Sequence, residues 1–205
     1  MKIHNRRSAY KIFLSYSLLV ATLFVADLPA VGQFTASVAP VPFKNFGKIN
    51  DHYYRGSQPV ADQFKQLQEL GIKTIIDLRQ DSLDEAAEWA RTAGLKYINI
   101  ALTTKRAATR EQTEEFLKLV SDEANWPVFV HCKGGRHRTG QMTAIYRITQ
   151  DGWTADQAYE EMKKFDFEDS FFYPRTLKKY VYSYYKEFTS RKPSTASTVT
   201  TAPSY

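Results

Sequence analysis

Between residues 43 and 188 the chain alternates short, apolar β-like runs with amphipathic stretches, and this alternation constrains the fold more than any other feature. In the amphipathic stretches the apolar residues recur three and four positions apart, which indicates helices. Alternation of this kind is typical of an α/β domain, in which helices cover a largely parallel sheet. We therefore expect a single α/β domain with a small, mostly parallel central sheet flanked by helices.

Local signals set the boundaries of the expected elements. Pro59 suits a first helical turn, and Gly71 and Gly94 suit helix ends. Thr109, followed three residues later by Gln112, has the pattern of a capping box. The expected helices span residues 60–70, 85–93, 139–150, 154–165 and 175–188, with one more starting at residue 109. The expected strands span residues 73–78, 95–101 and 128–130.

Residues 1–30 have the layout of an export signal. A start with four basic residues precedes a mostly apolar run from Ile12 to Val25, and small residues follow at Leu28-Pro29-Ala30. The run is 14 residues long, shorter than the roughly 20 that a membrane-spanning helix needs. We expect export to the periplasm or another extracytoplasmic compartment. A membrane anchor over residues 12–31 is the alternative, although it would include Asp27.

The rest of the chain divides by composition and charge. Residues 31–42 are expected to be a linker and residues 189–205, rich in Ser, Thr, Ala and Pro, a flexible tail, which leaves 43–188 as the domain. The formal net charge is +6, and half of it lies in the first 30 residues. The net positive charge of the rest of the chain is too small to indicate nucleic-acid binding. We expect a monomer.

The segment from His131 to Gly140, H-C-K-G-G-R-H-R-T-G, carries the chemistry, because it joins an expected buried strand to an expected helix. Backbone N–H groups at such a helix start can form an anion nest, and glycines in the loop allow an anion to approach the backbone closely. The expected phosphate-binding residues are Lys133, Gly134, Gly135, Arg136 and Gly140. The chain's single cysteine, Cys132, excludes an intramolecular disulfide.

Cys132 is expected to be a nucleophile. Cationic neighbours and a helix N-terminus lower a cysteine pKa from about 8.5 to a range of about 3.5–7.5, which favours the thiolate. In-line attack on phosphorus would then form a phosphocysteine. Arg138 can grip two phosphoryl oxygens with its planar fork, and Thr139 can hydrogen-bond the sulfur when it leaves.

This segment resembles the H-C-x5-R-[ST]-G signature of cysteine-dependent phosphatases, specifically the dual-specificity branch. More loosely, Tyr54 to Pro59, Ile76 to Arg79 and Val128 to Gly140 look like bacterial members related to plant and fungal atypical dual-specificity phosphatases. The resemblance covers about residues 43–188 and implies a phosphatase domain that hydrolyses phosphomonoesters. We expect no cofactor and no metal, since the four histidines do not cluster with carboxylates at ligand spacing. Tyr54 to Pro59 is expected to be a strand-to-helix turn.

One part of the family pattern is missing. The family usually carries an aspartate general acid on the loop before the capping-box helix, but residues 101–110 contain no carboxylate. Some relatives carry an acidic residue immediately before the signature arginine, a position that His137 occupies here. We therefore expect His137, with an ordinary pKa of about 6.5, to be the general acid. The alternative is that it only contacts phosphate. Asp166 and Asp169 are further candidates.

The positive charge of the loop bears on the substrate. Lys133, Arg136 and His137 lie in the loop, and Lys105 and Arg106 are expected on a facing loop. Loops with lysine after the cysteine look like those of phosphoinositide and inositol-polyphosphate phosphatases. Two substrate classes stay open: a protein carrying phosphotyrosine, phosphoserine or phosphothreonine, and a polyphosphorylated inositol or phosphoinositide. The alternative function is a non-catalytic phosphate-binding module that has lost its acid.

Overall fold

A computed structural model describes residues 43–168 and 175–191. The expected export signal, the expected linker and residues 192–205 of the expected tail lie outside the described residues. The last helix reaches Arg191, three residues beyond the boundary expected at 188. Among the described helices, none combines the length and the apolar character that crossing a bilayer requires.

The core of the fold is a five-stranded sheet in the order β1-β2-β5-β3-β4. Of the strands in the described residues, only β1 and β2 pair in antiparallel fashion, and the β2–β5, β3–β5 and β3–β4 pairs are parallel. The expectation of a mostly parallel sheet is therefore confirmed, with an antiparallel edge that was not expected. The strands are β1 (Gly47–Asn50), β2 (Tyr53–Ser57), β3 (Thr74–Arg79), β4 (Lys96–Leu102) and β5 (Val128–Cys132).

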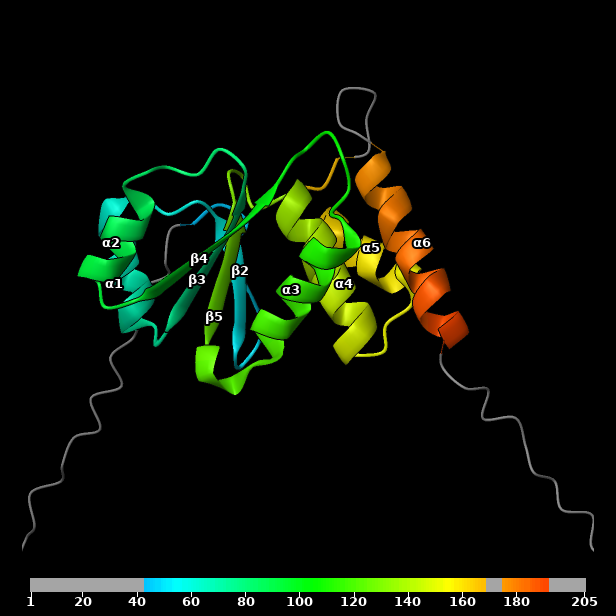
Figure 1. The fold of residues 1–205 in the computed structure, drawn as a ribbon, viewed down its shortest axis with the longest axis horizontal. Coiled ribbons are helices and arrows are strands. Elements are labelled where there is room, and N and C mark those ends of the chain that lie inside the picture. The colour runs from blue at the N-terminus through cyan, green and yellow to red at the C-terminus, as the bar shows by residue number, and fades with distance from the viewer. Residues whose placement is uncertain (1–42, 169–174, 192–205) are drawn as a thin grey trace, which may run out of the picture. The chain divides into compact units, whose positions relative to one another are not determined.

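Helices cover both faces of this sheet, as Figure 1 shows. Helices α1 and α2 pack on one face around Phe64, Leu67 and Phe129. On the other face α3 and α4 cover the sheet through Phe116 and Met142, and α5 and α6 pack against α4. The helices are α1 (Ala61–Glu69), α2 (Ala86–Thr92), α3 (Arg110–Ser121), α4 (His137–Gln150), α5 (Ala155–Lys164) and α6 (Thr176–Arg191), with a short 3-10 turn, η1 (Glu123–Asn125), before β5.

Two helix starts differ from those expected. Helix α1 begins after an N-cap at Val60, so Pro59 lies before the helix and not in its first turn. Helix α4 begins at His137, two residues earlier than expected. Gly135 has a left-handed backbone, with φ of +66°, and turns the chain so that the helix can begin at once. As a result Arg138 and Thr139 lie in the first turn of α4.

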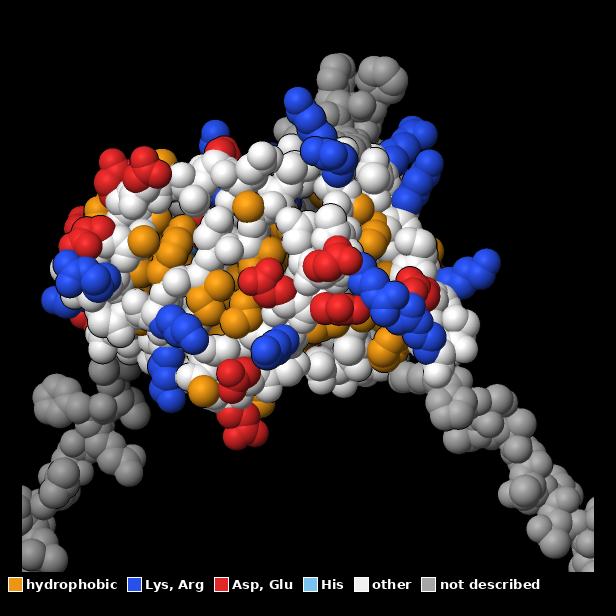
Figure 2. Space-filling model, viewed as in Figure 1, with side chains coloured by type: hydrophobic (Ala, Val, Ile, Leu, Met, Phe, Trp, Pro, Cys, Tyr) orange, Lys and Arg blue, Asp and Glu red, His pale blue; other side chains and the backbone are white. Residues whose placement is uncertain are grey.

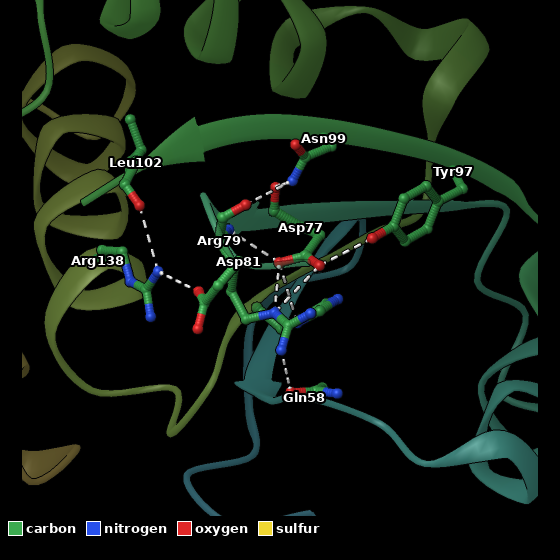
Figure 3. A network of polar contacts seen from close by, with 9 residues as sticks. Gln58, Asp77, Arg79, Asp81, Tyr97, Asn99, Leu102 and Arg138 are labelled. Carbon is green, nitrogen blue, oxygen red and sulfur yellow. Dashed lines mark hydrogen bonds and ion pairs between the residues drawn. The ribbon is translucent and has the colours of Figure 1, made fainter. Parts of the chain in front are cut away.

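Strand β3 ends in a buried ion pair (Figure 3). Both members are nearly inaccessible: Asp77 is 0% exposed and Arg79 is 3% exposed. The Arg79 Nε lies 3.3 and 3.2 Å from the two carboxylate oxygens of Asp77, and the Tyr97 hydroxyl donates to one of them at 2.8 Å. Because several donors converge on it, the carboxylate is compensated for the loss of water.

The ion pair also connects β4 to the segment that follows β2. Asn99 on β4 donates from Nδ2 to the backbone carbonyls of Asp77 and Arg79, each at 2.9 Å. On the other side, the Arg79 Nη1 donates to the Gln58 side-chain carbonyl. Figure 3 shows the guanidinium of Arg79 between Asp77 and Gln58. The network therefore fixes the position of Gln58 relative to the sheet.

We predict that Asp77→Asn lowers the free energy of unfolding by about 3–5 kcal/mol, because it leaves the Arg79 charge buried without its counter-ion. Urea unfolding followed by circular dichroism measures this. The control is Glu88→Gln, which breaks the exposed Arg91–Glu88 pair and should change stability little, since exposed pairs contribute little. Similar small losses for both variants would contradict the account of a buried, compensated pair.

Candidate active site

Cys132 is the last residue of β5, a strand that lies between β2 and β3 in the middle of the sheet. In parallel α/β sheets, ligands bind at the carboxyl ends of the strands. Residues 133–136 then form a short loop before α4 begins at His137. The sequence expectation that the cysteine loop joins a buried strand to a helix is confirmed. We call residues 132–138 the phosphate loop.

Three consecutive carbonyls of the phosphate loop each accept a hydrogen bond from outside it. The donors come from residues 45–58, which we call the collar. The Gln58 backbone N–H donates to the Lys133 carbonyl at 3.3 Å. The Asn45 Nδ2 donates to the Gly134 carbonyl at 2.8 Å, and the Arg55 Nη2 donates to the Gly135 carbonyl at 2.5 Å. Each peptide plane carries its N–H opposite its C=O. The N–H groups of residues 134, 135 and 136 therefore point away from the collar, in the arrangement of an anion nest.

Gly135 permits the close contact between the phosphate loop and β2. A Cβ built there would lie 2.5 Å from the Gly56 carbonyl carbon and 2.7 Å from the Ser57 nitrogen, far inside van der Waals contact. Its φ of +66° also favours glycine. The segment from Tyr54 to Pro59 was expected to be a strand-to-helix turn, but residues 54–57 belong to strand β2 and only Gln58 and Pro59 form the connection to α1. It has a second role that the sequence did not reveal, which is to support the phosphate loop from behind.

Two neighbouring cavities open beside the phosphate loop. The first has a volume of about 280 Å³ and is lined by Thr104, Cys132, Lys133, Gly134, Arg136, His137 and Arg138. The second has a volume of about 420 Å³ and is lined by Gln80, Asp81, Leu102, Thr103, Thr104, Lys105, Arg106 and Arg138. Thr104 and Arg138 line both. The structure thus brings most of the expected site residues to one cavity, and places Lys105 and Arg106 in the next.

Arg138 spans the wall between these cavities and is 6% exposed. Its Nη1 donates to the Leu102 carbonyl at 3.2 Å and lies 3.4 Å from the Asp81 carboxylate (Figure 3). Its Nε makes no hydrogen bond to any residue in the described ranges. One nitrogen of the guanidinium is thus anchored to residues that line the second cavity.

Asp81 was not expected at the site, because the turn after β3 carries no family signal. A hydrogen bond from its own backbone and the contact with Arg138 hold the pKa of Asp81 below its usual range. The carboxylate is therefore ionised at neutral pH and acts as a counter-ion of Arg138.

Two of the expected site residues are placed differently from the rest. Thr139 is 0% exposed, and its hydroxyl makes no hydrogen bond to a described residue, Cys132 included. Gly140 does not line the cavity but faces Met162 of α5 and Phe167 in the turn after it, where a Cβ would make ordinary contacts at 3.6–3.7 Å. A side chain at Gly140 would therefore be met by α5 and not by phosphate.

The two histidines of the segment are both buried. Burial lowers the pKa of His131 to about 4, against the opposing effect of Asp77, so His131 is neutral under ordinary conditions. Burial, and then the charge of Arg136, also lower the pKa of His137. Its ring meets Phe167 edge-on at a centroid distance of 5.3 Å. His137 lines the first cavity beside Cys132, but its lowered pKa makes the protonated form less available than in an exposed histidine.

The remaining acid candidates lie elsewhere. Asp166 sits in the turn after α5, with φ of 58°, and lines neither cavity. Asp169 is outside the described residues. Glu168, which the sequence did not single out, lies 3.4 Å from Arg136. In the described part of the chain, no three His, Cys, Asp or Glu side chains converge to form a metal site.

Comparisons with known proteins find a family model and several relatives that match this chain. The family described as a DSP-PTPase phosphatase fused to NAD+ kinase matches residues 41–173. The dual specificity protein phosphatase TpbA of Pseudomonas aeruginosa (strain UCBPP-PA14) is 31% identical over 152 residues, which cover 74% of this chain and 68% of TpbA. The inositol diphosphatase DSP2 of Oryza sativa subsp. japonica is 30% identical over 135 residues, covering 63% of this chain and 66% of DSP2.

Solved structures show the same fold. The core catalytic domain of the PP-IP phosphatase SIW14 from S. cerevisiae aligns with a TM-score of 0.63 at 24% identity, covering 73% of this chain and 91% of that one. The crystal structure of P. aeruginosa TpbA aligns with a TM-score of 0.59 at 28% identity, covering 71% of this chain and 91% of that one. The α/β fold with a mostly parallel sheet is therefore that of these phosphatases.

We predict that Gly135→Ala lowers kcat/KM for a phosphomonoester by at least about 100-fold, because the clash with Gly56 must displace the phosphate loop by a fraction of an ångström or more. The matched control is Gly152→Ala. Gly152 has a similar φ of +70°, but a Cβ there meets nothing within 4 Å, so this variant isolates the roughly 1–2 kcal/mol cost of a left-handed alanine. Equal losses of activity in the two variants would show that close packing against β2 is unimportant.

Proposed function

The chain belongs to the DSP-PTPase phosphatase family and is a Cys-dependent phosphatase, and from that premise we propose that it hydrolyses phosphomonoesters through a phosphocysteine formed on Cys132. One observation carries the proposal. The collar binds three consecutive carbonyls of the phosphate loop from outside, so the N–H groups of the same peptide planes point the opposite way, in the arrangement that binds an oxyanion.

The proposed reaction has two displacement steps. In the first, the Cys132 thiolate attacks phosphorus, an S–P bond forms, and the P–O bond to the leaving group breaks. The loop N–H groups and Arg138 stabilise the charge on the equatorial oxygens. The departing oxygen takes a proton, which we assign to His137. In the second step water attacks phosphorus and gives a proton to His137, the S–P bond breaks, and inorganic phosphate and the thiolate are released, which restores the starting state.

The first proposed substrate class is phosphorylated protein, with phosphotyrosine as the reference substrate. The cavity of about 280 Å³ that contains Cys132 is large enough for one phosphoryl group at its base. Among the relatives, TpbA is named a dual specificity protein phosphatase. A solved structure, 27% identical with a TM-score of 0.59 and covering 71% of this chain and 91% of that one, is of a Cys-to-Ser variant of TpbA in complex with pTyr.

A polyphosphorylated inositol or phosphoinositide is the second candidate, and the adjoining cavity favours it. Lys105 and Arg106 line this cavity, which shares Arg138 with the first, so a second phosphate would find further positive charge there. Figure 2 shows Lys and Arg side chains, without Asp or Glu between them, over the loop between β4 and α3 and over the start of α6. The rice relative is named an inositol diphosphatase.

A substrate panel tests the proposed function and separates the two classes. Wild type is expected to hydrolyse a phosphotyrosine peptide, an inositol polyphosphate or both, and Cys132→Ser to lose at least about 1,000-fold in kcat, since the nucleophile is gone. When wild type turns over a substrate with a labelled phosphoryl group, acid quenching should trap a phosphoprotein that carries the label on Cys132. Cys132→Ser as active as wild type on every compound would refute the mechanism.

The double variant Lys105→Met, Arg106→Met distinguishes the substrate classes in the same panel. For a polyphosphorylated inositol, KM should rise at least about tenfold, because two charges facing the second phosphate are removed. For a phosphotyrosine peptide, little change is expected. An equal effect on both substrates would mean that the second cavity does not select between them.

The role of His137 predicts a dependence on pH and on the leaving group. The protonated form is the donor, and the pKa is lowered, so the proton-transfer contribution should be lost as pH rises through a value below 6.5. His137→Asn should reduce kcat by about 100-fold or more for phosphotyrosine, but only slightly for p-nitrophenyl phosphate, whose leaving group needs no proton. Equal losses on both substrates would assign His137 to phosphate binding.

A further inference from the structure

Arg55 on β2 is a buried cation directly beneath the phosphate loop. It is 0% exposed and lies opposite Val130 of β5 in the sheet. Its Nη2 donates to the Gly135 carbonyl, while its guanidinium carbon lies 4.0 Å from the centroid of the Phe165 ring. The guanidinium is thus held between the loop and the turn that follows α5.

Three separate segments of the chain form the environment of the Arg55 guanidinium: strand β1, Phe165 after α5, and the phosphate loop. A Cβ at Gly47 on β1 would lie 2.5 Å from the Phe165 ring, so this ring reaches its position only because residue 47 is glycine. The ring then covers one face of the guanidinium, as in a cation–π pair. A planar guanidinium can stack on a ring and donate within its own plane at the same time, which an ammonium group cannot.

This charge is poorly compensated by its surroundings. The Nε and Nη1 of Arg55 are buried and make no hydrogen bond to any residue that the structure describes. Within the same ranges no carboxylate forms an ion pair with it, in contrast to Arg79, which has Asp77. Burial lowers the pKa of Arg55 to about 10, so the guanidinium stays charged at neutral pH. A buried cation in this state destabilises a fold.

Three groups whose ionised forms would favour the charged guanidinium of Arg55 indicate why this residue is present. They are Tyr53, Glu161 and Cys132. Tyr53 is neutral, because burial raises its pKa far above the physiological range. Glu161 is already paired with Arg147 at 2.7 Å. The remaining partner is the sulfur of Cys132, at the end of the neighbouring strand β5.

We propose that Arg55 is a positioning residue of the phosphate loop: it holds the Gly135 carbonyl outward and places a fixed positive charge beneath Cys132 and the bound phosphoryl group, and the fold is less stable because of it. The inference rests on the proposed function, which assigns the phosphate to this loop. Arg55 lies 77 positions before Cys132 in the sequence. It touches no substrate, yet it sets the geometry of the anion nest.

Binding of tungstate, a phosphate analogue, together with thermal unfolding tests the proposal on the full chain without relying on turnover. For Arg55→Met, tungstate affinity should fall about 10- to 100-fold, since a hydrogen bond and a charge beneath the loop are lost. The melting temperature should stay the same or rise, because a buried charge is replaced by an apolar side chain. Arg55→Lys restores the charge but not the geometry, and should bind tungstate with intermediate affinity.

The matched control is Arg147→Met. Arg147 also stacks on an aromatic ring, Trp153, at 4.4 Å, but it is paired with Glu161 and lies outside the phosphate loop. This variant should melt at a lower temperature and bind tungstate as wild type does. Such a contrast separates loss of structure from loss of positioning.

Three outcomes are decisive. Wild-type tungstate affinity in Arg55→Met would overturn the positioning role. A drop in melting temperature as large as that of Arg147→Met would overturn the claim that Arg55 destabilises the fold. A wild type that binds tungstate but hydrolyses no phosphomonoester would instead refute the proposed function, and the tungstate series would still decide the role of Arg55.

Discussion

The site depends on the direction in which three peptide groups point. A loop of this length has no regular hydrogen-bond partners of its own, so its carbonyls could turn toward a bound anion and repel it. The collar prevents this, because a separate donor binds each carbonyl of residues 133, 134 and 135 from outside. Preorganised N–H groups of this kind stabilise a developing oxyanion without having to reorient during the reaction.

The collar is in turn fixed by the sheet. Gln58 is held through Arg79 by the buried Asp77 carboxylate, while Arg55 is held between the loop and Phe165. The two guanidinium groups illustrate opposite solutions to burial. Arg79 has a compensating carboxylate and strengthens the fold around it, whereas Arg55 has none among the described residues and instead binds the Gly135 carbonyl of the phosphate loop. Stability and catalysis therefore place different demands on two arginines that lie close to the same loop.

The sequence predicted the features that depend on local pattern. Apolar periodicity located the helices because each buries one face, and the H-C-x5-R-[ST]-G segment located the cysteine and arginine because their spacing is local. Strands β1 and β2 were both missed, and most of β2 was interpreted as a turn. The four residues of β1 carry no alternation, and its glycine is required by Phe165, far away in the chain. The collar was also missed, because Asn45 and Arg55 lie 89 and 80 residues from the carbonyls they bind.

A crystal structure with orthovanadate bound tests the central claim most directly. The account predicts vanadium bonded to the Cys132 sulfur, equatorial oxygens bound by the N–H groups of the loop and by Arg138, and the carbonyls of residues 133–135 still bonded to the collar. Vanadate held by Lys105 and Arg106 with Cys132 unmodified, or a loop whose carbonyls have left the collar and turned toward the anion, would contradict it.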